Sequence, residues 1–147
     1  MHKDLLGALS TVLSDTVVLK YKVQGAHWNV VGPDFHQFHA FFEEIYLEID
    51  SAIDPLAEQI RTLGATAPFR LAEFSELSKI DQPVRTDNTS RALAKEIHTA
   101  IEVALTDISQ AFELANQLNE QGVLGLLAQR EDMLKKWRWQ LASALEG

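Results

Sequence analysis

The sequence predicts an all-α fold, a four-helix bundle formed by one domain over residues 1–147. Apolar residues recur at the three- and four-residue spacing of buried helix faces in four segments, and the chain contains only 7 Gly and 4 Pro. With 46% hydrophobic residues, the chain can bury a core without disulfides. An irregular connection, residues 64–87, separates the second segment from the third. Such a length is expected where the chain crosses from one end of a bundle to the other.

The first helix is expected over residues 4–30. Its buried stripe comprises Val12, Thr16, Leu19, Val23 and His27. A single histidine in such a stripe is more often a core residue than a metal ligand, and we expect the adjacent Trp28 to be a packing residue. The stripe therefore places His27 inside the bundle without giving it a role.

The second helix is expected to run from Pro33 to Leu63. Proline is favoured at a first helical position, because its missing N–H would have no intrahelical partner there, and Gly64 is expected to stop the helix. Pro55 lies inside this helix, where it removes one backbone hydrogen bond at a cost of up to about 3 kcal/mol. We expect a kink at Pro55 rather than a break, because helical periodicity resumes at once.

Two pairs of potential metal ligands lie along this second helix. His39 and Glu43 are four residues apart, and Asp54 and Glu58 have the same spacing. The members of each pair are therefore neighbours on one face. Glu43 and Asp54 are separated by nearly a whole number of turns, so both pairs share one stripe. At about 1.5 Å per residue, His39 and Asp54 lie about 22 Å apart, and one helix cannot bring all four to one metal.

A second copy of this helix, antiparallel across a two-fold axis, would complete two identical sites. The His39–Glu43 pair of one chain would then face the Asp54–Glu58 pair of the other. His27 would add a second imidazole. Two imidazoles and three carboxylates are a ligand set that suits iron, manganese or zinc.

Each of these residues also has an ordinary interpretation. The carboxylates can be solvated helix charges, His39 a core histidine, and Asp54-Pro55 a cap and first turn at a helix break. It is disfavoured that all of these ordinary interpretations hold at once, because charges repeated along so apolar a helix need partners or metal. The apolar residues around the stripe are Phe38, Phe41, Phe42, Ile45, Leu47, Ile49 and Ile53.

The remaining elements are ordinary bundle formers. A short helix is expected over residues 70–77, and Asn88 or a neighbour is expected to cap the third helix, which Gly122 ends. The buried stripe of the third helix comprises Ile97, Ile101, Ala104, Ile108, Ala111, Ala115 and Leu118. The buried face of the fourth comprises Leu127, Leu134, Trp137, Leu141 and Leu145.

Composition excludes several classes of protein. The chain has no cysteines, so it has neither disulfides nor thiolate metal sites. No apolar run approaches the roughly 18 residues of a membrane span, and the first residues begin a helix rather than a signal peptide, so we expect a cytoplasmic protein. The formal net charge of −8 argues against general affinity for nucleic acid, which needs a basic surface.

The His and carboxylate residues, with several residues between them, resemble the signature of the Dps family, the mini-ferritins named for DNA protection during starvation. The matching residues are His27-Trp28-Asn29, Gly32, Phe35, His39, Phe42-Glu43, Asp54 and Ala57-Glu58, followed by Leu71-Ala72-Glu73, Leu77 and Trp139. The resemblance covers nearly the whole chain. It implies a ferritin-like four-helix bundle with a long crossover, whose short helix lies at the contact between two chains.

The resemblance also implies a function and a site. It implies a ferroxidase that oxidises Fe(II) with hydrogen peroxide and stores the ferric mineral in a hollow homododecamer built from two-fold dimers, which protects against oxidative stress. The ligands implied at each inter-subunit site are His27, His39 and Glu43 of one chain with Asp54 and Glu58 of its mate. Trp28 would lie close enough to the iron to quench one-electron oxidants.

The chain departs from the family pattern in several places. It has no lysine-rich terminal extension, so we expect no DNA binding. Gly125 stands where many members have an aspartate that lines the three-fold pore, the route by which iron enters the shell. Gln59 stands where many have an arginine after the last ligand. Glu44 and Glu48, about 100° around the helix from the ligands, are candidates for mineral nucleation, with a solvated helix face as an equal alternative. Candidates for a substitute pore charge are Glu120, Glu131 and Asp132.

Two other functional classes stay open. A binding module would hold zinc or manganese at the same residues without turnover, and a structural helical oligomer would bind no metal. A single-chain di-iron bundle is disfavoured, because it requires Glu-x-x-His pairs on two helices. Here Glu96 is followed by His98, which is the wrong spacing.

Overall fold

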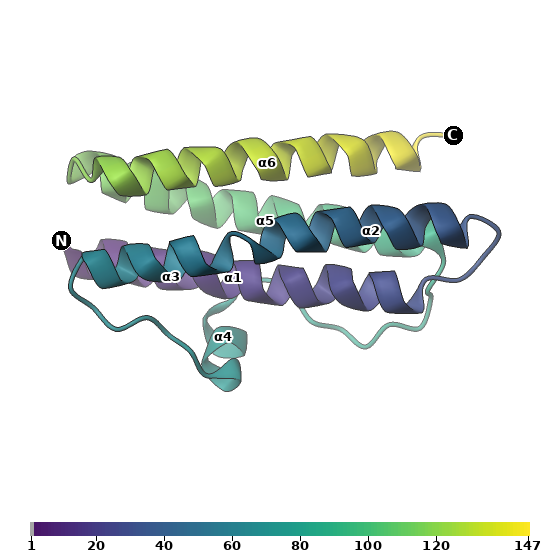
Figure 1. The fold of residues 1–147 in the computed structure, drawn as a ribbon, viewed down its shortest axis with the longest axis horizontal. Helices are drawn as coiled ribbons and strands as arrows, with labels where there is room; N and C mark the ends of the chain where they lie inside the picture. The colour runs from purple at the N-terminus through teal and green to yellow at the C-terminus, as the bar shows by residue number, and fades with distance from the viewer. Residues whose placement is uncertain (1) are drawn as a thin grey trace.

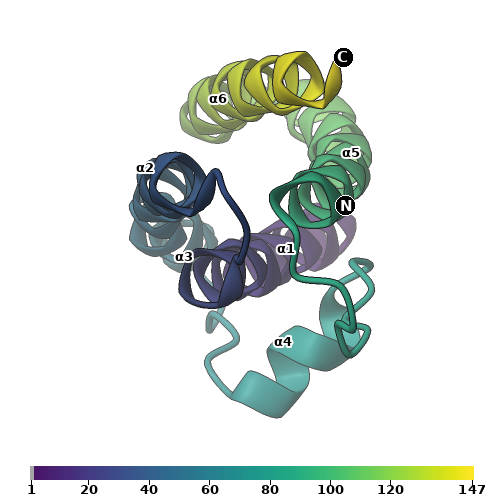
Figure 2. The same ribbon diagram turned by 90° about the vertical axis from the view of Figure 1, so that its right-hand side faces the viewer.

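The computed structural model describes residues 2–147, and every extended element of secondary structure within that range is a helix. The helices are α1 (His2–Asn29), α2 (Phe35–Asp50), α3 (Ile53–Thr62), α4 (Leu71–Leu77), α5 (Ser90–Gln117) and α6 (Gln121–Leu145). Figure 1 shows four long rods: α1, the consecutive pair α2 and α3, α5 and α6. Seen end on, these rods enclose a central core (Figure 2). The predicted four-helix bundle is confirmed.

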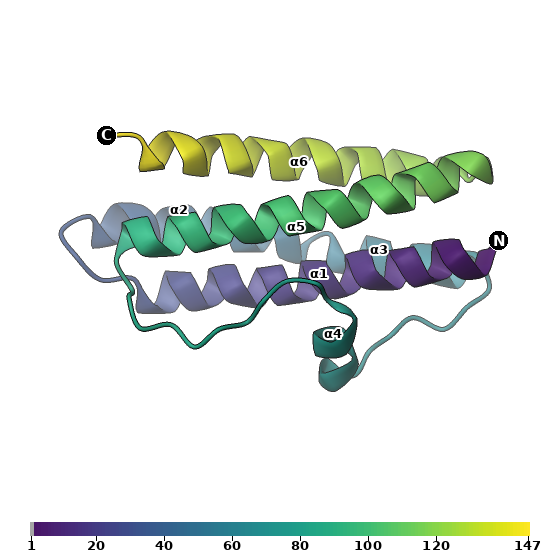
Figure 3. The ribbon, with the colours of Figure 1, turned by 180° about the vertical axis from the view of Figure 1, so that it is seen from behind.

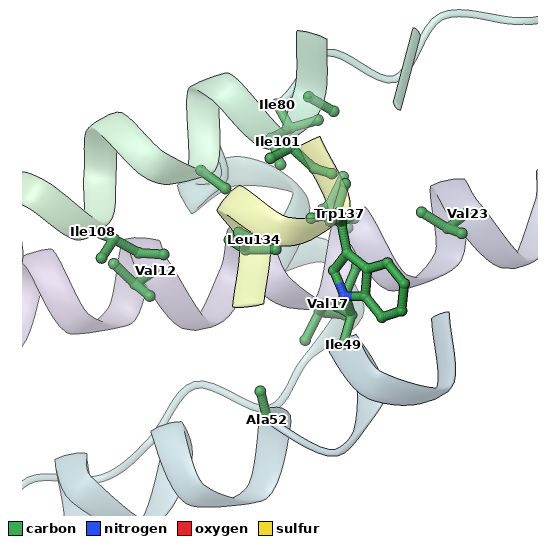
Figure 4. Close-up of a cluster of buried hydrophobic side chains, with 14 of the residues drawn as sticks. Val12, Val17, Val23, Ile49, Ala52, Ile80, Ile101, Ile108, Leu134 and Trp137 are labelled. Carbon is green, nitrogen blue, oxygen red and sulfur yellow. The ribbon is translucent and has the colours of Figure 1, made fainter. Parts of the chain in front are cut away.

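Buried apolar side chains from all four rods form one core. Figure 4 shows part of it, where side chains from α1, α2, α5 and α6 meet around Trp137. The predicted stripe of the third helix is buried from Ile97 to Ala115, and Leu118 lies half-buried at its end. These helices are therefore held mainly by burial of their apolar faces rather than by intrinsic helix propensity.

The prediction of one helix from Pro33 to Leu63, kinked but unbroken, is wrong. The observed helix begins at Phe35 and is interrupted at Ser51–Ala52. There the Ala52 N–H donates to the carbonyl of Ile49, three residues back. Pro55 explains the interruption, because it has no N–H to donate to a carbonyl one turn earlier. In the helix that follows, Pro55 lies in the first turn, where no such donor is needed. The two helices still follow one another along one side of the bundle (Figure 1).

Two helices end in the same left-handed turn. Gly64 (φ 91°) follows α3, and Asn119 (φ 56°) follows α5. After each, an N–H reaches back to the last helical turn, from Ala65 to the Ile60 carbonyl and from Glu120 to the Ala115 carbonyl. Gly64 therefore stops its helix as predicted. The prediction that Gly122 ends the third helix is wrong, because Asn119 takes the left-handed conformation first.

The crossover between α3 and α5 runs along the outside of the bundle from one end to the other (Figure 3). It carries α4, which packs against α1. At its end, the Thr89 hydroxyl accepts a hydrogen bond from the Ala92 N–H (3.3 Å) and caps α5. The predicted cap thus lies one residue after Asn88. No helix within residues 2–147 is long and apolar enough to cross a membrane.

Thr89→Ala should lower the free energy of unfolding by about 1 kcal/mol, because the cap of α5 loses its acceptor. Thermal unfolding at neutral pH should show a lower Tm by about 2–4 °C. Thr99→Ala is the matched control, since Thr99 is exposed inside the same helix and should leave Tm within about 1 °C. Equal Tm values for the two variants would contradict the capping role.

Candidate metal centre

His27 and His39 lie stacked at one end of the bundle. His27 is in the last turn of α1 and His39 in the second turn of α2, and Gly32 (φ 123°) lies in the turn that reverses the chain between these helices. The two imidazole rings are nearly parallel, with centroids 3.8 Å apart and an interplanar angle of 14°. His27 is buried and His39 is half-buried. The turn therefore pairs two histidines that are twelve residues apart in sequence.

Each histidine ring is hydrogen-bonded to the backbone of the other residue. His27 Nδ1 donates to the His39 carbonyl, and His39 Nδ1 donates to the His27 carbonyl, both at 2.7 Å. A carbonyl oxygen can only accept, so Nδ1 carries the proton in both rings. Each Nε2 then keeps its lone pair in the neutral imidazole. This is the arrangement that orients a histidine for metal binding through Nε2.

Two further aromatic rings extend the histidine pair. Phe35 stacks on His39 with centroids 4.9 Å apart, and Tyr46 lies tilted against His27 at 5.3 Å. These rings restrict the rotation of both imidazoles. Sequence reasoning missed Tyr46. Its signal was the seven-residue spacing from His39, two helical turns that return to the same face.

The three carboxylates of the predicted site lie exposed on α2 and α3. Glu43 is one turn after His39, whereas Asp54 and Glu58 lie beyond the interruption of the helix. Within residues 2–147 none of the three forms an ion pair. No three His, Asp or Glu side chains in this part of the chain are grouped so as to hold a metal. One chain thus brings the histidines together but leaves Asp54 and Glu58 on a separate helix.

Apolar side chains share the exposed surface near these ligands. Leu47, one turn after Glu43 on α2, is 54% exposed, and Trp28, next to His27, is 60% exposed. The expectation that Trp28 is a packing residue is therefore wrong for the single chain. Its indole lies on the surface because the adjacent residue, His27, points into the bundle.

Comparison with known proteins places the chain in a family. Residues 6–147 match the family described as "Ferritin-like domain". DNA protection during starvation protein 2 of Bacillus anthracis is 30% identical over 145 residues, which cover 99% of both chains. The chain belongs to the Dps family of ferritin-like proteins.

Solved structures agree with this membership. The Dps protein of Vibrio cholerae O1, described as a member of a superfamily of ferritin-like diiron-carboxylate proteins, superposes with a TM-score of 0.92 at 27% identity. That match covers 98% of this chain and 90% of the other. Antigen TpF1 of Treponema pallidum gives a TM-score of 0.94 at 28% identity, with 99% and 93% covered. The Dps fold thus accounts for essentially the whole chain.

The two nucleation candidates of this Dps chain lie in different surroundings. Glu44 is exposed and, together with Trp139, lines a surface pocket of about 360 Å³ between α2 and α6. Glu48 is half-buried and forms an ion pair with Arg130 of α6, whose side chain is only 2% exposed. Its carboxylate also accepts a hydrogen bond from Trp137 Nε1 (2.9 Å). The solvated-face interpretation is therefore wrong for Glu48.

The residues at which this chain departs from the Dps pattern are also placed. Gly125 lies exposed on α6. Gln59 accepts a hydrogen bond from the Thr62 hydroxyl (3.2 Å). The three candidates for a substitute pore charge each have a cationic or imidazole partner: Glu120 with His2, Glu131 with Lys135 and Asp132 with Lys136.

Arg130→Met should lower the free energy of unfolding by about 2 kcal/mol. It keeps an unbranched side chain but leaves the Glu48 carboxylate without its buried partner, and Glu48 still reaches some water. Lys136→Met, which removes the exposed partner of Asp132 on the same helix, is the control and should change stability by less than about 0.5 kcal/mol. Urea unfolding would measure both. Similar losses for both variants would contradict a structural role for the Arg130–Glu48 pair.

Proposed function

We propose that this protein oxidises Fe(II) with hydrogen peroxide at sites shared by two chains and stores the ferric product inside a hollow shell. The observation that carries the proposal is the stacked histidine pair, whose protonated Nδ1 atoms leave both Nε2 atoms without a proton, with the exposed carboxylate of Glu43 one helical turn after His39. Neutral imidazole and carboxylate together suit iron, and also zinc or manganese. Membership of the Dps family supports iron among these metals.

The proposed ligands come from both members of a two-fold dimer. His27, His39 and Glu43 of one chain would meet Asp54 and Glu58 of the partner subunit. One chain alone cannot join them, because the helix rise separates His39 from Asp54 by about 22 Å. The exposed indole of Trp28 and side chain of Leu47 lie beside these ligands and would be covered by the second chain. Six such dimers would form the proposed homododecamer.

The residues of the site have distinct tasks in this reaction. The two imidazoles bind Fe(II) as neutral ligands, and the carboxylates balance its charge and favour the harder Fe(III) product. Two Fe(II) ions lose one electron each, and hydrogen peroxide accepts both as its O–O bond breaks to give two hydroxide ions. Ferric ions take up these hydroxides as the mineral forms. Trp28, next to His27, would donate an electron to a stray one-electron oxidant.

We also propose that the protein does not bind DNA. A formal net charge of −8 opposes association with the polyanionic backbone of DNA. We therefore propose iron detoxification in the cytoplasm without coating of DNA. Glu44 remains a candidate for mineral nucleation, whereas Glu48 would have to act while paired to Arg130.

His39→Ala/Asp54→Ala should slow peroxide-driven iron oxidation by at least about tenfold, because each site loses one imidazole and one carboxylate. Fe(II) is added anaerobically, hydrogen peroxide follows, and ferric absorbance is recorded while light scattering reports the particle size. His36→Ala is the control, since His36 is exposed three residues before His39. An intact particle with the wild-type rate would refute the proposed site. If the wild-type protein bound metal but did not oxidise iron, it would instead be a zinc- or manganese-binding protein.

Mixed particles should show that the site is shared. In a dimer of one His39→Ala chain and one Asp54→Ala chain, one site loses both ligands and the other keeps both. Random pairing of equal amounts should therefore restore about a quarter of the wild-type sites, although every site of each variant alone lacks one ligand. Co-expression of the two chains followed by the same oxidation assay measures this. No recovery in the mixed particles would place all the ligands within one chain.

A further inference from the structure

A pair of buried carboxyl groups lies on the bundle apart from the metal ligands. Asp15 of α1 is 1% exposed and Asp107 of α5 is 4% exposed. The two side chains are close enough to hydrogen-bond to each other. The Oδ2 atom of each is buried, and no residue in the range 2–147 donates a hydrogen bond to it. Two such atoms can satisfy each other only if one of them carries a proton.

The crossover is attached to this carboxyl pair. Asp15 Oδ1 accepts hydrogen bonds from the Ser78 hydroxyl (2.8 Å) and the Lys79 N–H (2.9 Å), directly after α4. The Lys79 ammonium lies 3.3 Å from Asp107 Oδ1. The next residue, Ile80, is buried in the core. The pair thus joins three parts of the chain that are distant in sequence.

We propose that Asp15 and Asp107 share one proton, and that this proton holds the crossover segment 78–80, and with it α4, against α1 and α5. The proton resides on Asp15, because Asp107 keeps the ammonium of Lys79 as its counter-charge. Protonated Asp15 donates from Oδ2 to Asp107 Oδ2 and still accepts from the crossover through Oδ1. Loss of the proton places two carboxylates against each other in a buried position, which disfavours the docked crossover.

The electrostatics of the site agree with this assignment. Burial, together with the hydrogen bond to Asp107, raises the pKa of Asp15 to about 8. The charged groups that face it are Asp107 from α5 and Lys79 from the crossover, and no other ion pair to either carboxylate occurs within residues 2–147. When the crossover opens, Asp15 meets water and its pKa returns towards the ordinary value of 3.8. Between these two values opening releases a proton, so rising pH favours opening.

Native-state hydrogen exchange of the full protein, read at residues 71–80, tests the proposal. In the wild type, the equilibrium constant for opening should rise by about tenfold per pH unit from about pH 5.5 to about pH 8 and then level off. Asp15→Asn keeps the acceptor for Ser78 and Lys79 and places a permanent donor opposite Asp107. That variant should lose the pH dependence. A wild-type profile without this slope, or an Asp15→Asn profile that keeps it, would overturn the proposal.

Asp81→Asn is the matched control, because Asp81 is an exposed carboxylate in the same crossover and its loss should leave the slope unchanged. Asp107→Asn provides a second variant, since it offers a donor from the opposite side and removes the opposing carboxylate; because Asp15 stays buried, the rise should persist but level off at a lower pH than in the wild type. Carbon-13 NMR of the wild type gives a reading that needs no variant. One Asp carboxyl should titrate near pH 8, and if all titrate below about pH 6, no proton is shared.

Discussion

The reciprocal hydrogen bonds between His27 and His39 are the interaction on which the functional end of this molecule depends. Each ring is held by the backbone of the other residue, so the positions of α1 and α2 and the orientation of both imidazoles are set together. Any movement of one helix along the other would break both bonds. The same contacts therefore stabilise the turn between the helices and orient the two Nε2 atoms that we propose as metal ligands. A substitution that weakened these hydrogen bonds would therefore disturb both the turn and the orientation of the imidazoles.

Two polar networks inside the bundle complement the apolar core. The Glu48–Arg130–Trp137 group connects α2 to α6, and the Asp15–Asp107 group connects the crossover to α1 and α5. Apolar packing gives most of the stability but is poorly directional, whereas buried polar groups tolerate few alternative arrangements. Each network thus fixes an element at one position along the bundle. Only the aspartate pair needs a bound proton to satisfy its buried oxygen atoms, because the Glu48 carboxylate is already paired with Arg130.

Local spacing predicted those features that a single helix determines. The periodicity of the third helix and the i, i+4 ligand pairs required only that the segments be helical. The Arg130–Glu48 pair was not predictable in this way, because its members are 82 residues apart and meet only when α6 lies beside α2. The end of α5 was misjudged because Asn119 competes with Gly122 for the left-handed turn. The shared site between two chains remains a prediction from spacing and resemblance.

The interruption at Ser51–Ala52 divides the rod that carries the proposed ligands into two pieces. His39 and Glu43 belong to α2, and Asp54 and Glu58 belong to α3, so the relative rotation of the two pairs is decided in the joint between them. Adding or removing one residue there would turn the second pair by about 100° about the helix axis. If the proposed site exists, a joint of this kind allows evolution or protein engineering to adjust its metal preference by changing the connection alone, while every proposed ligand stays in place on its own helix.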